Sequence, residues 1–464
     1  MLNQSPLVYQ AENIPEVVAV VDCNREINFS HLKSLLANYV SFLEQLKLNE
    51  GDRIAFVARN RLEEIALLWA IYYYKAVAVP LSNRYTTEQL EQVIKKFSIN
   101  CFINITEDNF NFQTLCVELP DINQSITSTR KLYDLEFDQT AGIVLSSGST
   151  GEPKGVVHTF GNYYLSAAGA NEILNLKQGD RYLLSLPKYH VGGIGIAFRS
   201  VLAGATIVIP EQNLSLAENI KKYQITHLSL VATQLKELLE TIDNSAFGQL
   251  KAILLGGSAI PDNLIEQALT NNIPILKSYG STESASLVTA TRLGDPIEKL
   301  KTSGKVLPHR KIKISEEGEI LIGGDVVFKK YFNDPKGNLP EDFFATGDIG
   351  SIDEDGYLTV TGRKDNMFIS GGENIYPEEI EAVLLSHQQI KEAVVVPIID
   401  EKFGFVPAAF ILSEEPFDFD QLDWPLEKFK KPKKIFPWPP EYKKTGLKIN
   451  RICFIERAKN GALN

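Results

Sequence analysis

A run of ten residues at 146–155 combines the groups that a bound polyphosphate requires. The run contains three glycines, four hydroxyl residues and one lysine. Glycines let backbone amides approach an anion closely, hydroxyl groups donate hydrogen bonds, and a lysine brings a mobile positive charge. A surface turn needs no such combination, so the run predicts a phosphate-binding loop. The residues expected to bind phosphate are Ser146, Ser147, Gly148, Ser149, Thr150, Gly151 and Lys154.

The nearest alternative is the Walker loop, whose pattern is G-x-x-x-x-G-K-[ST]. In this chain Pro153 stands where that pattern has the glycine before its lysine, and Gly155 stands where it has a hydroxyl residue. The sequence therefore argues against a kinase or GTPase of the Walker type.

Acidic and cationic residues farther along the chain could complete such a site. Glu283 follows the hydroxyl residue Thr282, and these two oxygen ligands suit a Mg²⁺ ion bound to phosphates. Asp348 could accept hydrogen bonds from two ribose hydroxyls, and Arg363 adds a planar fork of donors. Taken alone, Glu283 is more typical of a solvated carboxylate, and a local ion pair is the alternative for Asp348 and Arg363.

Together these motifs resemble the adenylate-forming superfamily, which contains acyl-CoA synthetases, nonribosomal adenylation domains and firefly luciferase. Besides 146–155, the matching segments are SYGSTE at 278–283, TGD at 346–348, GRKD at 362–365 and the lysine at 448, in the family's order. The resemblance implies an α/β fold and a two-step reaction. ATP and a carboxylic acid would give an acyl-AMP and pyrophosphate, and CoA would then convert the acyl-AMP into an acyl-CoA and AMP.

The resemblance also implies a role for individual residues. Glu283 and Thr282 would hold the metal ion, and Tyr279 would stack near the adenine. The catalytic residues would be Lys448, Thr282, Glu283 and His190. Besides the phosphate loop, the residues implied to contact the nucleotide are Gly256, Gly257, Ser258, Tyr279, Gly280, Ser281, Asp348 and Arg363.

The C-terminal lysine of the family has a clear chemical purpose. A pentavalent α-phosphate and the attacking carboxylate are both negative, and an incoming ammonium group stabilises both. Lys448 matches this lysine, although Leu447 stands where the family has a glycine. Lys444 is therefore a rival for the role.

In the family a C-terminal domain rotates about a hinge between the two half-reactions. By resemblance the pivot is Asp365, so residues 1–364 would bind ATP and the acid, and residues 365–464 would form a mobile domain with the catalytic lysine. Glycines near this hinge could admit the thin pantetheine arm of CoA. The segment expected to face the active site during thioester formation is Ser370, Gly371 and Gly372.

Several segments are similar to one branch of the superfamily, the o-succinylbenzoate–CoA ligases of menaquinone and phylloquinone synthesis. They are VHT at 157–159, LSLPKYH at 184–190, LSLVATQL at 228–235, LLGGSAIP at 254–261 and FISGGENIYP at 368–377. The chain also lacks the insertions of fatty-acyl synthetases. This resemblance implies o-succinylbenzoate as the acid.

Arg199 is the residue most suited to recognising that acid. It lies in an apolar helix expected at 194–202, where a lone arginine needs an anionic partner or an exit to water. We expect it to bind the aromatic carboxylate, which leaves the succinyl carboxylate for adenylation. A surface-reaching arginine or a structural salt bridge is the alternative. His190 and His158 are further acid-site candidates, and each could instead be a core histidine.

The elements that must position these residues alternate between strand-like and helix-like segments. Strands are expected at 53–58, 76–80, 142–145, 181–185, 206–210, 227–231 and 252–255, and helices at 62–74, 215–223 and 261–270. Such alternation predicts parallel sheets covered by helices.

The later part of the sequence predicts short strands separated by turns. Strands are expected at 311–315, 319–322, 357–361, 393–397 and 407–412, and a helix at 377–386. The expected fold is α/β: a large N-terminal domain of two sheet subdomains plus a small β-rich subdomain, then a mobile α+β C-terminal domain.

Composition narrows the class of protein. The chain has 464 residues, and single hydrophobic cores stop growing at roughly 250 to 300 residues, so several packed units are expected. A net charge of −11 argues against nucleic-acid binding. Five lysines within 428–434 predict either a solvated face or a rim that attracts a polyanionic cofactor. Four dispersed cysteines show no zinc-site or disulfide spacing.

No membrane or export signal is visible. The apolar stretch at 65–80 is interrupted by Lys75 and is too short to span a bilayer, and no secretory signal precedes it. We expect a cytoplasmic protein whose partners are small molecules: the acid, ATP and CoA, with Mg²⁺. The oligomeric state stays open.

The leading hypothesis is an acid–thiol ligase that makes o-succinylbenzoyl-CoA. Alternatives within the superfamily are a ligase for another aryl or aliphatic acid, or an acyl-AMP ligase that loads a carrier protein. A module that only binds would need to have lost a catalytic group. All five expected groups are present: Lys154, Glu283, Asp348, Arg363 and Lys448.

Overall fold

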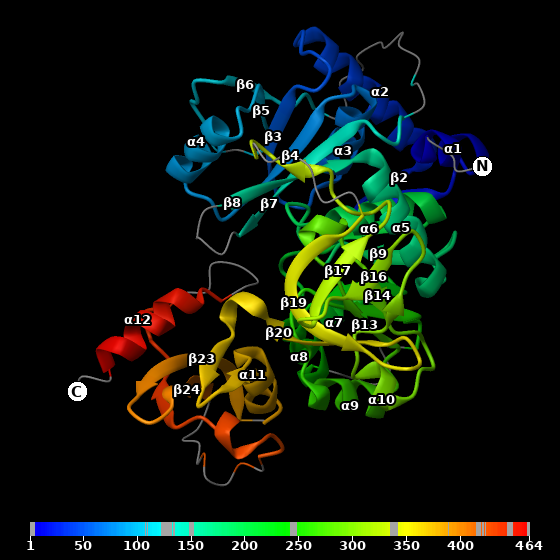
Figure 1. Cartoon of the computed structure of the whole chain (residues 1–464). Coiled ribbons are helices and arrows are strands. Elements are labelled where there is room, and N and C mark those ends of the chain that lie inside the picture. Colours follow the sequence, from blue (N-terminus) through cyan, green and yellow to red (C-terminus); the bar gives the residue numbers. More distant parts are fainter. Residues whose placement is uncertain are drawn as a thin grey trace.

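Strands and helices alternate along the first part of the chain and assemble into two large sheets (Figure 1). The computed structural model describes residues 5–106, 108, 110–121, 132, 135–147, 153–241, 248–334, 342–387, 389–413, 419, 422, 424–442 and 449–461. Apolar runs between turn residues form the strands, as the sequence predicts.

The first large sheet has seven strands, ordered β18-β8-β7-β4-β3-β5-β6. Its strands from β7 to β6 are parallel, whereas β8 runs antiparallel to both β7 and β18. The bounds are β3 (Arg53–Ala58), β4 (Val77–Ser82), β5 (Cys101–Asn104), β6 (Leu115–Glu118), β7 (Thr140–Ser147), β8 (Pro153–Thr159) and β18 (Lys330–Tyr331).

The second large sheet has nine strands, ordered β15-β14-β13-β12-β11-β9-β10-β1-β2. Its six central strands, from β13 to β1, are parallel. The bounds are β1 (Val18–Asp22), β2 (Arg25–Asn28), β9 (Arg181–Leu183), β10 (Thr206–Ile209), β11 (His227–Leu230), β12 (Ala252–Leu255), β13 (Ile275–Tyr279), β14 (Thr289–Ala290) and β15 (Lys305–Val306).

Helices separate the two sheets and cover their outer faces. One apolar cluster contains side chains from both sheets and from α2 (Phe29–Gln45), α3 (Leu62–Tyr73), α5 (Phe160–Leu174) and α6 (Val191–Ala203). Alternate residues of β3 face opposite ways, since Phe56 belongs to this shared cluster and Val57 to an outer one with α4 (Thr87–Lys96). The other outer layer is α7 (Leu216–Lys222), α8 (Ala232–Glu240) and α9 (Asp262–Thr270).

A small antiparallel sheet follows, ordered β16-β17-β19-β20, with its own apolar cluster. Its bounds are β16 (Lys311–Ile314), β17 (Glu319–Gly323), β19 (Phe344–Ile352) and β20 (Leu358–Arg363). Figure 1 draws this sheet in yellow, between the green nine-stranded sheet and the last part of the chain.

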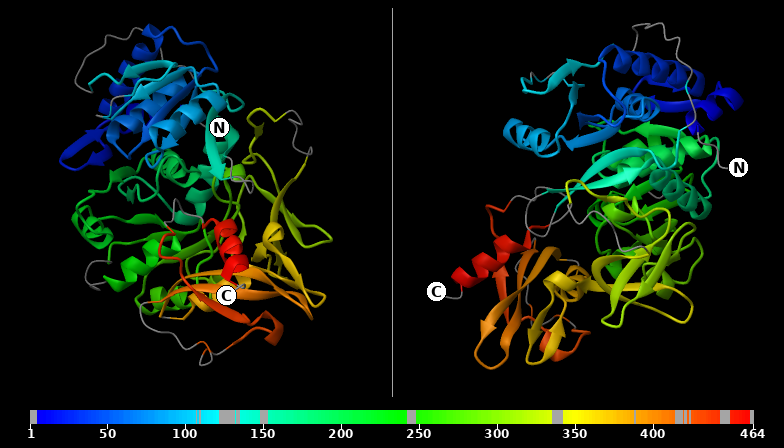
Figure 2. Two further views of the ribbon diagram at one scale, coloured as in Figure 1. Left: turned by 90° about the vertical axis from the view of Figure 1, so that its left-hand side faces the viewer. Right: turned by 45° about the horizontal axis from the view of Figure 1, so that its top comes forward.

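The last part of the chain packs around its own core, and the right-hand view of Figure 2 shows it as a separate body in orange and red. The long hairpin of β23 (Ile390–Asp400) and β24 (Gly404–Ser413) packs α11 (Pro377–Leu385) on one face and α12 (Arg451–Gly461) on the other. The remaining strands are β21 (Phe368–Ser370), β22 (Glu373–Ile375) and β25 (Lys434–Pro437).

The expected fold class is therefore confirmed: two α/β sheet units, a small β unit and an α+β unit. The apolar clusters change between Val360 and Phe368, and the proposed division at 364/365 stays a prediction. Within the described ranges, no helix is long and apolar enough to cross a membrane.

Candidate active site

The predicted site residues gather at the carboxyl ends of the parallel strands. Tyr279 ends β13, Gly256 follows β12, the segment leading to His190 follows β9, and Ser146 lies near the end of β7. Parallel strands end at one edge of a sheet, and ligand sites in α/β proteins form outside that edge. The topology thus explains how motifs far apart in sequence come together.

Tyr279, Asp348 and Arg363 form one hydrogen-bonded group between the nine-stranded sheet and the small sheet. The Tyr279 hydroxyl donates to Oδ2 of Asp348 at 2.6 Å, and Nη1 of Arg363 donates to Oδ1 at 2.9 Å. Asp348 and Arg363 are cross-strand partners on β19 and β20. Burial, reinforced by the Asp348 carboxylate, raises the pKa of Tyr279 well above its usual value, so its hydroxyl remains a donor. The two carboxylate oxygens keep acceptor capacity for a ligand's hydroxyl groups.

Two glycines let neighbouring protein atoms pack closely beside Tyr279. A Cβ atom on Gly280 would lie 1.7 Å from the carbonyl oxygen of Ser286, and one on Gly256 would lie 2.7 Å from Oγ of Ser278. Ser286 itself has a φ of 118°, which is strained for a residue other than glycine. The hydroxyl of Ser281 is buried without a hydrogen-bond partner among the described residues. The segment around Tyr279 thus combines closely packed backbone with one unsatisfied polar group.

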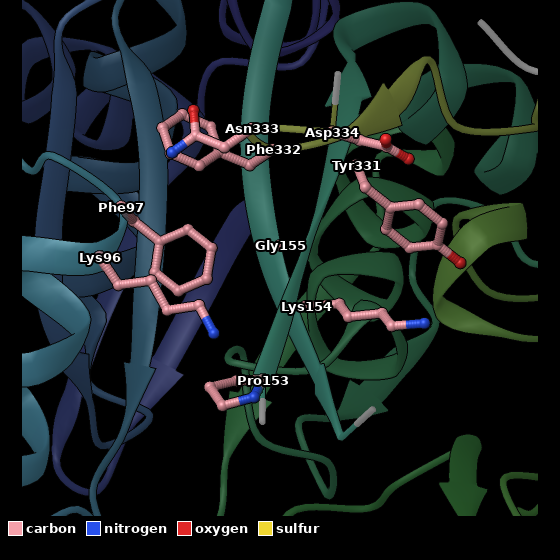
Figure 3. A pocket seen from close by; sticks show the side chains of 9 residues that line it. All are labelled: Lys96, Phe97, Pro153, Lys154, Gly155, Tyr331, Phe332, Asn333 and Asp334. Carbon is pink, nitrogen blue, oxygen red and sulfur yellow. The ribbon is translucent and has the colours of Figure 1, made fainter. Parts of the chain in front are cut away.

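The ends of the predicted phosphate loop form a β-ladder in which Ser146 pairs with Lys154. The Lys154 ammonium lies 5.5 Å from the centre of the Tyr331 ring. Figure 3 shows the two side chains on the same side of the paired strands, with Phe97 on the opposite side. These residues line a cavity of about 320 Å³. Four of the residues predicted to bind phosphate lie outside the described residues: Gly148, Ser149, Thr150 and Gly151.

Glu283 lies on the far side of Tyr331, whose hydroxyl donates to Oε1 of Glu283 at 2.9 Å. Burial, together with this carboxylate, raises the pKa of Tyr331. Thr282 begins the same short 3₁₀ turn. Where the chain is described, no group of three or more His, Cys, Asp or Glu side chains could hold a metal by itself. One carboxylate beside a hydroxyl fits Mg²⁺, which in nucleotide sites takes its other ligands from phosphates and water.

Arg199 is buried in α6 with only 2% of its surface exposed. Its Nε donates to Gly195 O at 2.9 Å, and its Nη1 donates to the Tyr182 hydroxyl at 3.0 Å. Within the described residues its side chain bonds only such neutral groups, including Gly192 O at 3.4 Å. The Arg199 side chain therefore does not reach water, and no carboxylate of the described residues forms a salt bridge with it.

A second buried arginine lies near the first. Burial, followed by the charge of Arg199, lowers the pKa of Arg310 to about 9. Its donors go to the backbone, including Leu287 O at 2.8 Å and Ser166 O at 2.9 Å. Two guanidinium groups in one apolar interior attract an anion strongly.

The two histidines expected at the acid site have different surroundings. His190 is the half-buried N-cap residue of α6, and its ring lies 4.7 Å from that of Tyr189. His158 is fully buried on β8, and its two ring nitrogens have no hydrogen-bond partner among the described residues. Burial lowers the pKa of His158 to about 3, against the opposing effect of the nearby Thr282 backbone. His158 is thus neutral and supplies no positive charge to an acid.

The predicted hinge residue Asp365 is linked to the hydrogen-bonded group of Tyr279, Asp348 and Arg363. Nη2 of Arg363 bonds Oδ2 of Asp365 at 3.0 Å, while Nη1 holds Asp348. Ser370 is buried at the end of β21, and Gly371 and Gly372 make the turn that follows with φ values of 59° and 94°. The predicted catalytic lysine, Lys448, lies outside the described residues, as does its rival Lys444.

Sequence reasoning missed several neighbours of the site. Tyr182, Tyr331 and Arg310 carry no motif, and only the pairing of distant strands brings them beside Arg199 or Glu283. It also missed a fully buried ion pair, in which Nζ of Lys188 lies 2.9 Å from Oε2 of Glu64. Lys188 sits inside the quoted segment at 184–190, where an apolar helix of the other sheet unit supplies its partner.

Comparisons with known proteins agree along nearly the whole chain. The model of the AMP-binding enzyme family matches residues 7–332. The chain is 33% identical over 435 residues to a 2-succinylbenzoate–CoA ligase of Bacillus licheniformis, covering 90% of this chain and 91% of that protein.

Solved structures of o-succinylbenzoate CoA synthetase from Bacillus subtilis are also similar. The complex with the acyl-adenylate intermediate OSB-AMP has a TM-score of 0.84 at 31% identity, covering 93% of this chain and 94% of that one. The complex with ATP and a magnesium ion has a TM-score of 0.86 at 30% identity, covering 93% and 95%.

Proposed function

This chain belongs to the AMP-binding enzyme family, and we propose that it is a 2-succinylbenzoate–CoA ligase acting in menaquinone or phylloquinone synthesis. It is an adenylate-forming acid–thiol ligase that uses ATP, Mg²⁺ and CoA. The observation that carries the choice of acid is Arg199, a buried guanidinium without a carboxylate partner in the described part of the chain.

The reaction has two steps. In the first, a carboxylate oxygen of the acid attacks the α-phosphorus of ATP, the bond from that phosphorus to the bridging oxygen breaks, and pyrophosphate leaves. In the second, the thiol sulfur of CoA attacks the acyl carbonyl carbon, AMP leaves with the bonding electrons, and the thiol proton is released. The products are the acyl-CoA and AMP.

Three residues bind the nucleoside in this proposal. Asp348 accepts hydrogen bonds from the ribose hydroxyls, and Arg363 holds the carboxylate in place at 2.9 Å. Tyr279 donates to the other carboxylate oxygen and presents its ring to the adenine. Ribose and adenine are therefore recognised by one connected group.

The phosphates lie toward Lys154 and Glu283. Lys154 neutralises the phosphate oxygens that leave as pyrophosphate. Glu283 and Thr282 hold Mg²⁺, which neutralises charge on the phosphates as the leaving group departs. Tyr331 keeps Glu283 oriented through its 2.9 Å hydrogen bond.

The acid has two carboxylates, and the site must distinguish them. Arg199 binds the one on the aromatic ring, so the succinyl carboxylate is left at the α-phosphate. His190 stands at the start of the same helix, and in this proposal it is assigned to the reacting carboxylate. His158 takes part only as a neutral wall of the interior.

The C-terminal residues act in turn. Lys448 stabilises the adenylation transition state, and a rotation about Asp365 then brings the turn at Ser370, Gly371 and Gly372 to the site for the thiol. The Arg363–Asp365 ion pair at 3.0 Å joins this hinge to the ribose group, so the hinge can respond to the nucleotide.

A turnover assay tests the proposal. The purified protein is given ATP, Mg²⁺ and CoA with 2-succinylbenzoate, with 4-oxo-4-phenylbutanoate, which lacks the ring carboxylate, or with aliphatic acids. We expect efficient release of AMP and thioester from the first acid and poor turnover of the others. Equal rates with the acid that lacks the ring carboxylate contradict the choice of acid. Pyrophosphate release without CoA-dependent AMP release would instead indicate a carrier-protein ligase.

A further inference from the structure

Lys188 and Glu64 form an ion pair in the interior, with side chains 1% and 0% exposed. The Lys188 ammonium also donates to Oδ1 of Asn60 at 3.1 Å. A buried pair of this kind often adds no net stability over apolar residues of similar size, although breaking it by removing one partner is strongly destabilising. Net stability therefore does not account for the pair, and its effect lies in the segments that it holds in place.

The pair joins the two large sheets. The Glu64 carboxylate, in the first turn of α3, accepts hydrogen bonds from the backbone amides of Arg59 at 2.7 Å and Asn60 at 3.1 Å, just after β3. The Asn60 side-chain amide donates to Leu184 O at 3.2 Å and Leu186 O at 3.4 Å, just after β9. Glu64, Asn60 and Lys188 thus fasten the end of a strand in one sheet to the segment at 184–190 in the other.

That segment supports the start of α6. A Cβ atom on Gly193 would lie 2.2 Å from Pro187 O, so the helix rests directly on the backbone beside Lys188. The amide of His190 also donates to Pro187 O at 3.1 Å. Gly192 O, in the same turn, accepts from Nη2 of Arg199. A displacement of Lys188 would therefore reach Arg199 through less than three turns of helix.

We propose that Lys188 is a positioning residue for acid recognition, which with Glu64 and Asn60 fixes the segment at 184–190 and so sets where the guanidinium of Arg199 lies. This role rests on the proposed function of Arg199. It explains why an ion pair occurs at a point where apolar packing would be enough to stabilise the fold. Lys188 does not touch the substrate.

Paired substitutions test this role. Lys188→Met keeps the length of the side chain and removes its charge, and Glu64→Gln removes the charge of its partner. Each single variant leaves a buried unpaired charge and should lower the melting temperature. The double variant Lys188→Met/Glu64→Gln contains no unpaired charge, so its melting temperature should recover in large part; the single amide oxygen can replace only one of the two carboxylate oxygens that accept the Arg59 and Asn60 amides.

Steady-state kinetics separate positioning from stability. In the double variant we expect the KM for 2-succinylbenzoate to remain raised by about tenfold, the usual effect of losing one charged hydrogen bond, while the KM for ATP is unchanged. The matched control is Lys251→Met. Lys251 pairs at 2.5 Å with the buried Asp180, and these residues directly precede β12 and β9. They lie at the amino-terminal ends of the strands, away from the carboxyl ends where the acid site is proposed. Both KM values should therefore stay as in the wild type.

Two outcomes overturn different claims. Recovery of both the melting temperature and the KM for the acid in the double variant would show that the pair is only structural, and the positioning role would be wrong. Arg199→Gln, measured in parallel, reports on the acid site itself. An unchanged KM for the acid in that variant overturns the proposed role of Arg199, and with it the role of Lys188.

Discussion

The Tyr331 hydroxyl lies 2.9 Å from the Glu283 carboxylate, and this contact joins the edge of the seven-stranded sheet to the end of the nine-stranded sheet. Lys154 packs against the same tyrosine ring. The proposed metal ligand Glu283 and the proposed phosphate-binding Lys154 thus contact the same aromatic residue, which carries no sequence motif.

Glu283→Gln should weaken the use of Mg²⁺. The amide keeps the size of the side chain but loses its charge, so we expect kcat to fall by about 100-fold and the Mg²⁺ concentration at half-maximal rate to rise. The measurement is pyrophosphate release across a Mg²⁺ titration. Tyr331→Phe is the matched control, because it removes one hydrogen bond and leaves the charge. If Tyr331→Phe lowers kcat as much as Glu283→Gln does, the fall in kcat comes from the orientation of Glu283 and not from its charge.

Asp348→Asn should raise the KM for ATP by about 10- to 100-fold, because hydrogen bonds to the charged carboxylate are replaced by weaker ones to an amide. The KM for the acid should change little. Asp325→Asn serves as control, since that carboxylate is 70% exposed and its one ion pair among the described residues is with His309 at 3.9 Å. A KM for ATP that is the same in both variants would rule out the ribose contact.

Arg199→Gln should raise the KM for 2-succinylbenzoate by about 100-fold with little change for ATP, because the ring carboxylate loses a buried charged partner. With 4-oxo-4-phenylbutanoate, which has no ring carboxylate, wild type and variant should become similar. A variant that discriminates between the two acids as well as the wild type does would move the recognition site elsewhere.

Lys448→Ala should abolish acyl-AMP formation while leaving thioester formation from supplied acyl-AMP almost intact, because the ammonium group acts on the α-phosphate only in the first step. Lys444→Ala distinguishes the rival lysine. Half-reaction assays with pyrophosphate and thioester readouts provide the measurement. An equal loss in both half-reactions is inconsistent with a C-terminal domain that presents different faces in turn.

His158 should make folding stability depend on pH. Its pKa is about 3 in the folded chain and about 6.5 when unfolded, so the unfolded chain binds the extra proton between these values. The contribution of the neutral ring is complete above pH 6.5 and is lost as the pH falls toward 3. At pH 4.5 the loss amounts to about 3 kcal/mol. In His158→Gln, urea denaturation at pH 7.5 and 4.5 should show that much less pH dependence, and an unchanged dependence would exclude His158 as its source.

The sequence predicts local elements well wherever an apolar run is bounded by turns. The strand at 53–58 and the strand at 252–255 match β3 and β12 residue for residue, because both are buried on two faces. Tyr279, Asp348 and Arg363 were also found from motifs, and the structure brings them into one group.

The site neighbours that the sequence does not predict are missed for one physical reason. Tyr331 pairs with β8, whose residues precede it by more than 170 positions, and Glu64 meets Lys188 across two sheets. No local periodicity records such contacts, because they depend on which strands become neighbours. The sequence offers His158 either an acid-site role or a place in the core, and the β8 register turns it into the apolar interior, which favours the core alternative.

The cluster of apolar side chains that both large sheets share has a consequence for how the protein denatures. Neither sheet can open to solvent without exposing the inner face of the other, so both should melt in a single transition. The clusters after Phe368 contain none of those side chains. Calorimetry should therefore resolve a second, smaller heat-absorption peak, and ATP should shift the larger one.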